Sequence, residues 1–444
     1  MSTLFLTPTS PSHFLHVYCI LLAWIAFGIS TLNCQTTTPP NADPFPTPPD
    51  KKGLQVQMVD DALSLGVHHA ALNVSLGALW DDTPRATSWP VSSGGHQYFI
   101  NGPYAQQLTV QIKTLSDGGT LVYLILLAYP SHVPTKDALL LHPKSNAETG
   151  YTIGAFNTAS AEGLDLYRAL VGFLAERHSG AHPDLGRVWG YIVGNEVNSQ
   201  WLWYHLGRQS LAETVSDYEK AVRATHEAVR QHSTHARCYI SLDHHWSASM
   251  PGIGKSDAYP GRDLLDAFAA VARARGDFEW HVAHHPYPDD LGNPRNWLDK
   301  DAPPTDDAPH VTFKNLPVLC KHLERPALLW QGLPRRVILS EQGLHCLATP
   351  DGENLQAAGF AYVWEQVARC PGIDALIWHR HVDHSQEGGL RLGLWENKPG
   401  TISEPGRKRR LYDMFQKAAT PEWTTAAKWA LPIVGLESWD ELAQ

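Results

Sequence analysis

Two glutamates each stand at the end of an apolar run, although they lie far apart in the sequence. Glu196 follows VWGYIVGN, and Glu341 follows VILS. Such runs, rich in β-branched residues, predict buried strands, so both carboxyl groups are expected at strand ends. A carboxyl group that stays protonated beside one that stays ionised can cleave a glycosidic bond. The first would protonate the leaving oxygen, and the second would attack the anomeric carbon.

The elements that must position these glutamates alternate along the chain. Strands are predicted at 67–74, 97–102, 120–129, 188–196, 237–245, 279–287, 335–343 and 373–381. Helices are predicted at 104–116, 160–178, 212–232, 262–275, 312–324, 354–369 and 405–417. This order predicts an α/β protein whose residues 51–417 form a single catalytic domain, a (β/α)8 TIM barrel. An open doubly wound sheet that binds a dinucleotide is disfavoured, because no G-x-G-x-x-G turn follows an early strand.

The segments that follow the predicted strands differ from those that precede them. The former are long, aromatic and polar, as in residues 130–159 and in VNSQWLWYHLG directly after Glu196. The latter are shorter and plainer. Active sites of such barrels lie at the C-terminal ends of the strands. We therefore expect both glutamates to project into one mouth that long loops surround.

At these positions the chain resembles the clan A retaining glycoside hydrolases. The resemblance rests on Asn195 and Glu196 at the end of the fourth predicted strand and on Glu341 at the end of the seventh. It extends to Tyr287 in HHPYP, after the sixth strand, and to Trp378 in the eighth. The GNEVN…W segment also resembles an uncharacterised branch of barrel proteins. No arginine occupies the position near the second predicted strand where many clan members carry one.

The resemblance implies a role for each matched residue. Glu196 would be the acid/base and Glu341 the nucleophile of a retaining double displacement, with no cofactor and no metal. Asn195 would bind the sugar hydroxyl next to the reacting carbon. Tyr287 would lie near the nucleophile, and Trp378 would form an aromatic platform for the sugar.

Three further residues are candidates for substrate binding. Trp201 stands in the loop after the fourth strand, where its ring would either stack on a sugar or close the loop. His244 and His285 stand near the ends of the fifth and sixth strands, where imidazoles can hydrogen-bond sugar hydroxyls. The expected partner is therefore a carbohydrate.

Two other functions remain open from the sequence. The histidine clusters could hold a metal together with Glu196 and with Asp243 or Asp383, as in a metal-dependent amidohydrolase. The clusters are His68-His69, His244-His245, His284-His285, and His379 with His381 and His384. Two observations argue against the metal site. Adjacent histidines on a strand point to opposite faces, so they cannot both face one ion. The metal-dependent mechanism also leaves Glu341 without a role. The other alternative is a non-catalytic carbohydrate-binding barrel, which both glutamates disfavour.

The ends of the chain and its charge complete the predictions. The apolar run 17–29 predicts a signal peptide or N-terminal anchor within residues 1–34, and hence a secreted, periplasmic or cell-surface protein. Residues 35–50 are Pro-rich and predict an extended linker. Residues 418–444 would be an extension on or near the barrel. The formal charge of −10, without a basic tract, argues against nucleic-acid binding.

Overall fold

The chain forms a closed parallel barrel, as the alternation of strands and helices predicts. The computed structural model describes residues 39–145 and 150–443, so the predicted leader lies outside the described residues. Eight strands of this described part close the barrel in the order β1-β10-β9-β8-β7-β6-β5-β2. They are β1 (Lys52–Gln55), β2 (His69–Ser75), β5 (Leu121–Leu127), β6 (Val188–Val193), β7 (Arg237–Leu242), β8 (His281–His284), β9 (Val337–Leu339) and β10 (Ile373–Trp378).

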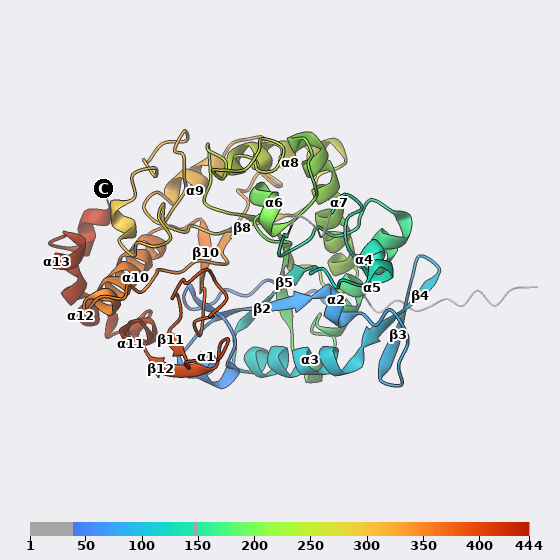
Figure 1. Cartoon of the computed structure of the whole chain (residues 1–444), viewed down its shortest axis with the longest axis horizontal. Helices are drawn as coiled ribbons and strands as arrows, with labels where there is room; N and C mark the ends of the chain where they lie inside the picture. Colours follow the sequence, from blue (N-terminus) through green and yellow to red (C-terminus); the bar gives the residue numbers. More distant parts are fainter. Residues whose placement is uncertain (1–38, 146–149, 444) are drawn as a thin grey trace, which may run out of the picture. The chain divides into compact units, whose positions relative to one another are not determined.

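A helix follows each barrel strand along the chain, and these helices surround the barrel (Figure 1). They are α1 (Val59–Ser64), α3 (Gly102–Asp117), α5 (Ala161–Arg177), α7 (Leu211–Arg230), α8 (Gly261–Ala274), α9 (Pro317–Leu323), α10 (Gly352–Ala368) and α11 (Arg410–Lys417). Short helices lie in the loops: α2 (Leu76–Leu79), α4 (Pro134–Leu140) and α6 (Gln200–Trp203).

Two of the predicted strands are placed differently by the structure. The first barrel strand is β1, which is only four residues long and was too short for its periodicity to be seen in the sequence. The predicted strand 97–102 exists as β4 (His96–Asn101), but it pairs antiparallel with β3 (Ser88–Ser93) in a hairpin outside the barrel. The predicted first strand, 67–74, is therefore the second strand of the barrel. The total of eight holds because the missed strand and the misplaced strand compensate.

The core has two layers, which follow from the alternation of side chains along each strand. In β5, Tyr123 and Ile125 belong to the cluster inside the barrel. Leu124 and Leu126 belong to the cluster between barrel and helices. Strands such as β5 and β6 are buried on both faces, which explains the near-continuous apolar runs of the sequence.

The helices bury the faces that their spacing predicts. In α8, Leu264, Leu265 and Phe268 are fully buried, and Val271 of the predicted stripe is partly buried. The N-terminus of α7 is closed by a capping box between Ser210 and Glu213. The predicted helix 405–417 starts later, at Arg410, because 405–408 form β12 (Pro405–Lys408) opposite β11 (Trp395–Asn397).

Residues 40–50 of the predicted linker lie against the barrel and do not form a free spacer. The ring of Phe45 contacts that of Trp189 at a centroid distance of 5.6 Å, and the guanidinium of Arg237 lies 3.7 Å from the Phe45 ring centre. Asp43 forms an ion pair of 2.5 Å with Arg187. The segment lacks repetitive structure, as its prolines predict, but its apolar side chain at position 45 packs against the interior cluster.

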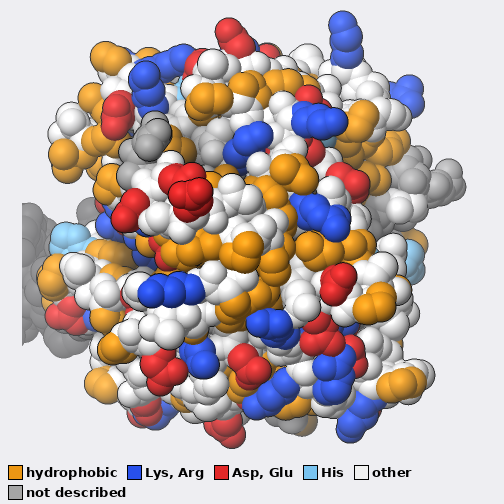
Figure 2. Space-filling view, turned by 90° about the vertical axis from the view of Figure 1, so that its left-hand side faces the viewer, with side chains coloured by type: hydrophobic (Ala, Val, Ile, Leu, Met, Phe, Trp, Pro, Cys, Tyr) orange, Lys and Arg blue, Asp and Glu red, His pale blue; other side chains and the backbone are white. Residues whose placement is uncertain are grey.

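Residues 418–443 pack on α10. Trp423 of α12 (Trp423–Ala426) donates a hydrogen bond of 2.7 Å to Glu365, and its ring contacts Phe360. Positive and negative side chains are mixed on the side of the molecule that carries α13 (Leu431–Val434), with apolar side chains between them (Figure 2). Within the described residues, no helix has the length and apolar character needed to cross a membrane.

Candidate active site

The acid after β6 is held in an unusual backbone conformation. Glu196 has a φ of 41° and a ψ of 53°, in the left-handed region that costs a non-glycine residue about 1–3 kcal/mol. Its backbone N–H donates to the Ser241 hydroxyl at 2.9 Å. Gly194, two residues earlier, also has a positive φ of 73°. Two left-handed residues turn the chain sharply, and the Glu196 carboxyl group thereby faces the next strands of the barrel.

Asp243, directly after β7, locks the loop that carries Glu196. Its carboxylate accepts hydrogen bonds from Asn198 and Ser199, and its backbone N–H donates to the Asn198 side chain at 2.9 Å. The same carboxylate accepts from the backbone and the ring of His245, at 2.8 and 2.9 Å. Burial opposes ionisation, but these hydrogen bonds outweigh it and hold the pKa of Asp243 well below its usual range. A buried, fully hydrogen-bonded carboxylate gives this loop one fixed conformation.

Glu196 forms a buried pair with His285. The ring Nδ1 of His285 lies 2.9 Å from Glu196 Oε1, and its Nε2 lies 3.0 Å from the Ser340 hydroxyl. Burial raises the pKa of Glu196 to about 7, although the hydrogen bond and charge of His285 lower it. Burial lowers the pKa of His285, but the hydrogen bond to Glu196 and the charges of Glu341, Glu196 and Asp243 together outweigh burial, so the pKa is raised. The pair therefore holds a proton that can be released near neutral pH.

Glu341 lies beside this pair. One carboxylate oxygen of Glu196, one of Glu341 and a ring nitrogen of His285 all lie within 4.8 Å of one another. The Tyr287 hydroxyl donates to Glu341 Oε1 at 3.2 Å. Burial, followed by the charge of Glu341, raises the pKa of Tyr129 to about 12. The two glutamates thus lie close together just after β6 and β9.

The other predicted site residues divide into two groups. Asn195 is buried, and its side chain makes no hydrogen bond to another described residue. Tyr287 contacts Glu341, and His285 contacts Glu196. His244 is buried in a separate group of histidines next to Asp243. These four residues lie at the same end of the barrel as the two glutamates, where the strands terminate.

One predicted aromatic contact is placed elsewhere. Trp378 is fully buried in the outer layer, where its ring contacts Phe360 of α10 at 5.2 Å. Its neighbour Ile377 points into the barrel, so alternation sends Trp378 outward and away from any sugar. The prediction of a platform at Trp378 is therefore wrong. Trp201 packs on His205 at a ring distance of 4.6 Å, while Trp203 contacts the interior cluster.

The residue that takes the inward position after β10 is His379. Its ring nitrogens bond Gln55 at the end of β1 and Glu387, the latter at 2.8 Å. Tyr129, two residues past β5, also lies near Glu341 and packs against the interior cluster. Neither His379 nor Tyr129 was predicted from the sequence to lie at the site. A signal was present for each, since both follow an apolar strand as Glu196 and Glu341 do.

The histidine clusters do not meet in one centre. His69 bonds the Tyr123 hydroxyl at 3.0 Å near the start of β2, away from the mouth. His381 pairs with Asp61 at 2.8 Å, and Asp383 forms a buried ion pair with Arg409. The clusters of the predicted amidohydrolase alternative therefore do not combine into a single centre. In His285 both ring nitrogens are hydrogen-bonded, so neither has a lone pair free for a metal.

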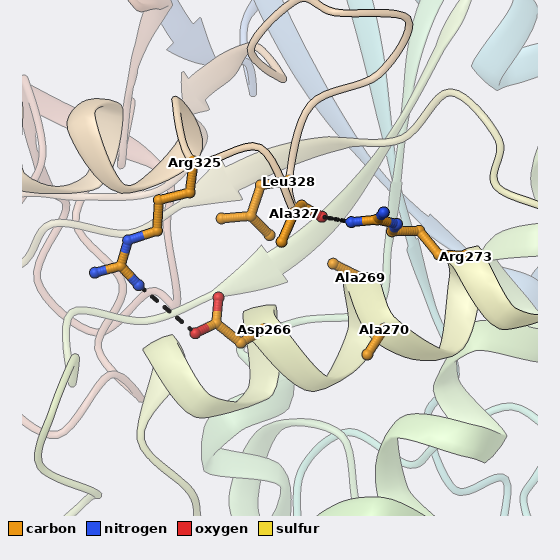
Figure 3. A pocket seen from close by; sticks show the side chains of 7 residues that line it. All are labelled: Asp266, Ala269, Ala270, Arg273, Arg325, Ala327 and Leu328. Carbon is orange, nitrogen blue, oxygen red and sulfur yellow. Dashed lines mark hydrogen bonds and ion pairs between the residues drawn. The ribbon is translucent and has the colours of Figure 1, made fainter.

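A surface hollow on the helix layer offers no comparable chemistry (Figure 3). It lies between α8 and the segment after α9. Asp266 faces Arg325 at 3.9 Å, and Arg273 donates to the carbonyl oxygen of Ala327 at 3.0 Å. The remaining lining is small and apolar. Its polar groups are occupied with one another, so this hollow is not the candidate site.

A family model covers most of the chain. Residues 44–442 match the family described as "Family of unknown function (DUF5722)". The chain belongs to DUF5722. A comparison with curated proteins found no match.

Two solved structures of glycosidases resemble this DUF5722 member. A family 39 glycoside hydrolase from Bacteroides cellulosilyticus WH2 is 14% identical, with a TM-score of 0.53 over 84% of this chain. The chain spans 64% of the length of that protein. A β-glucosidase from Pyrococcus furiosus is also 14% identical, with a TM-score of 0.53 over 84% of this chain and 86% of that one. At such identity the likeness shows the barrel fold.

The turn at Gly194 allows a test of how the site is positioned. A Cβ atom at Gly194 would lie 2.6 Å from the Tyr204 ring, in addition to its positive φ. Gly252 has a similar φ of 78° with nothing within 4 Å of a Cβ. We expect Gly194→Ala to destabilise the fold by about 1–3 kcal/mol more than Gly252→Ala, because only the former overpacks the core. Thermal unfolding of both variants measures this, and equal losses would contradict it.

Proposed function

We propose that this protein is a retaining glycoside hydrolase. The observation that carries the proposal is the approach of two carboxyl groups, Glu196 and Glu341, to within 4.8 Å at the ends of β6 and β9. Retaining glycosidases hold their carboxyl groups about 5–5.5 Å apart, whereas inverting enzymes need about 6.5–9.5 Å to admit a water. Carboxylate oxygens that lie no more than 4.8 Å apart support the first arrangement, in which one carboxylate attacks the sugar directly.

The environments of the two acids suggest their roles. A pKa of about 7 keeps Glu196 protonated in part at neutral pH, so it can protonate the leaving oxygen. Glu341 would attack the anomeric carbon, with Tyr287 donating to its carboxylate. Glu196, now ionised, would take a proton from the water that hydrolyses the glycosyl-enzyme. Asn195, whose amide is unpaired among the described residues, would bind the neighbouring hydroxyl.

The substrate would be an oligo- or polysaccharide outside the cytoplasm. The apolar run 17–29 supports export, and the aromatic rings around the mouth support a sugar. Tyr129 and Trp203 pack against the cluster inside the barrel, and Trp203 belongs to the loop after Glu196. These two rings replace Trp378 as candidates for contact with the sugar.

The stereochemistry of the product tests the proposal. The purified protein is screened on aryl β- and α-glycosides and on polysaccharides, and the first product of the best substrate is followed by NMR. We expect the anomeric configuration of the substrate to be retained before mutarotation sets in. An inverted first product would refute the double displacement. Sugar binding without any turnover would instead identify a carbohydrate-binding barrel.

A further inference from the structure

Three imidazoles meet next to the proposed active site without a role in it. His244 and His245 follow β7, and His310 lies in the loop between β8 and β9. An antiparallel bridge joins His245 to His310, and the backbone N–H of Val311 donates to His244 at 2.8 Å. One ring nitrogen of each histidine lies within 4.8 Å of the others. The ring of His244 is stacked on that of His245, and the His310 ring stands edge-on to both.

Two of these rings are oriented by buried or half-buried carboxylates. His245 Nδ1 lies 2.9 Å from Asp243, and His310 Nδ1 lies 2.8 Å from Asp289. Asp289 is itself held by the backbone N–H groups of Lys300 and Asp301, at 2.7 and 2.8 Å. A ring that donates from Nδ1 keeps the lone pair of Nε2 free. This carboxylate–histidine arrangement is the usual support of a metal-binding imidazole.

The third ring carries an independent sign of a missing partner. His244 is 9% exposed, and its Nδ1 is buried without a hydrogen-bond partner among the described residues. A buried polar nitrogen with no partner costs about 1–3 kcal/mol and calls for an explanation such as a bound ion. A cation held between the three rings would be coordinated by one of the two ring nitrogens of His244, Nδ1 or Nε2. An anion would not be attracted by converging lone pairs.

We propose that His244, His245 and His310 bind one divalent transition-metal ion, with zinc the best match. Imidazole ligands suit zinc and its neighbours, whereas magnesium and calcium prefer oxygen ligands. Zinc–nitrogen distances are about 2.0–2.1 Å, and three ring nitrogens within 4.8 Å of one another are near enough to share one ion. Three protein ligands leave a fourth position for water or for a substrate oxygen.

The ion would support the mouth of the barrel. Asp243 bonds both His245 and the loop of Asn198 and Ser199, which follows directly after Glu196. The ion would thereby join the loops after β6, β7 and β8. It takes no part in the two-carboxylate chemistry proposed above, so either proposal can fail without the other.

Calorimetric titration of the full, chelator-treated chain with zinc chloride tests the site. We expect one ion per chain and a higher Tm in the presence of zinc, since a ligand that binds only the folded state stabilises it. His310→Ala should abolish binding. Asp289→Asn should weaken it about 10–100-fold, as loss of an orienting carboxylate does elsewhere. His235→Ala, at an exposed histidine outside the group, should bind as the parent does.

Cobalt(II) gives a second readout that does not depend on activity. The parent should show the visible absorption of a tetrahedral cobalt site, and His310→Ala should lose it while keeping its circular dichroism spectrum. Absence of zinc binding by the parent would overturn the proposal. Unchanged binding by a folded His310→Ala variant would overturn it equally.

Discussion

Replacing Glu341 with glutamine should reduce kcat by on the order of 10⁴-fold or more. The amide cannot attack the anomeric carbon, so the glycosyl-enzyme does not form. The side chain keeps its shape, and the Tyr287 hydroxyl can still donate to the amide oxygen, as it does to the carboxylate at 3.2 Å. Binding of the substrate and Tm should therefore change little. Steady-state kinetics on the substrate found in the screen, with Tm measured in parallel, checks this.

The control for this variant is Glu404→Gln. Glu404 is exposed and lies opposite Lys398 at 3.7 Å, so it should contribute nothing to turnover. Equal rates for this control and the parent show that the loss is specific to the site. A Glu341→Gln protein that retains a tenth of the parent rate would remove Glu341 as the nucleophile.

The second large effect concerns the proton on Glu196. Burial raises the pKa of Glu196 to about 7, and the protonated form is the one that assists departure of the leaving group. Activity should therefore be present below pH 7 and fall as the pH rises through about 7. Glu196→Gln should lower kcat by about 10²–10⁴-fold for substrates with poor leaving groups. It should also remove the alkaline limb of the pH profile, which is the fall in activity above pH 7. Aryl glycosides with strongly acidic phenols should lose far less in the first step.

His285→Gln separates a positioning role from a structural one. The hydrogen bond and charge of His285 lower the pKa of Glu196, although burial raises it overall. A neutral side chain at position 285 removes the charge, so the alkaline limb should move to higher pH. A merely structural role for His285 would lower kcat without moving the limb. The pH profiles of kcat/KM for the parent and this variant distinguish the two.

Much of the fold follows from local patterns. Apolar runs such as VWGYIVG and TLVYLILL are buried on both faces in the barrel, and the stripe of α8 faces the core as its spacing predicts. Short strands are poorly predicted from such patterns. β1 has four residues, too few to display a period, while β4 displays one that its hairpin partner satisfies outside the barrel. The predicted fold class is nevertheless correct, because closure of the barrel depends on the number of strands.

Which side chains meet depends on packing between distant segments. The end of β10 illustrates this, since the strand stops at Trp378 and alternation directs that ring into the helix layer. His379 then takes the inward place, where Gln55 from β1 and Glu387 from a later loop bind it. The group of His244, His245 and His310 was likewise invisible in the sequence, because His310 arrives from a loop without periodicity.

Two acids at the ends of buried strands in an eight-stranded barrel can be inferred from local patterns, because strand periodicity and side-chain chemistry are local properties. The structure alone decided that the carboxyl oxygens approach within 4.8 Å and that burial brings the pKa of Glu196 to about 7. The separation of the two carboxyl groups and the exclusion of solvent from Glu196 depend on which segments pack together in space. They arise when β6, β7, β8 and β9 line up in this order around one closed sheet.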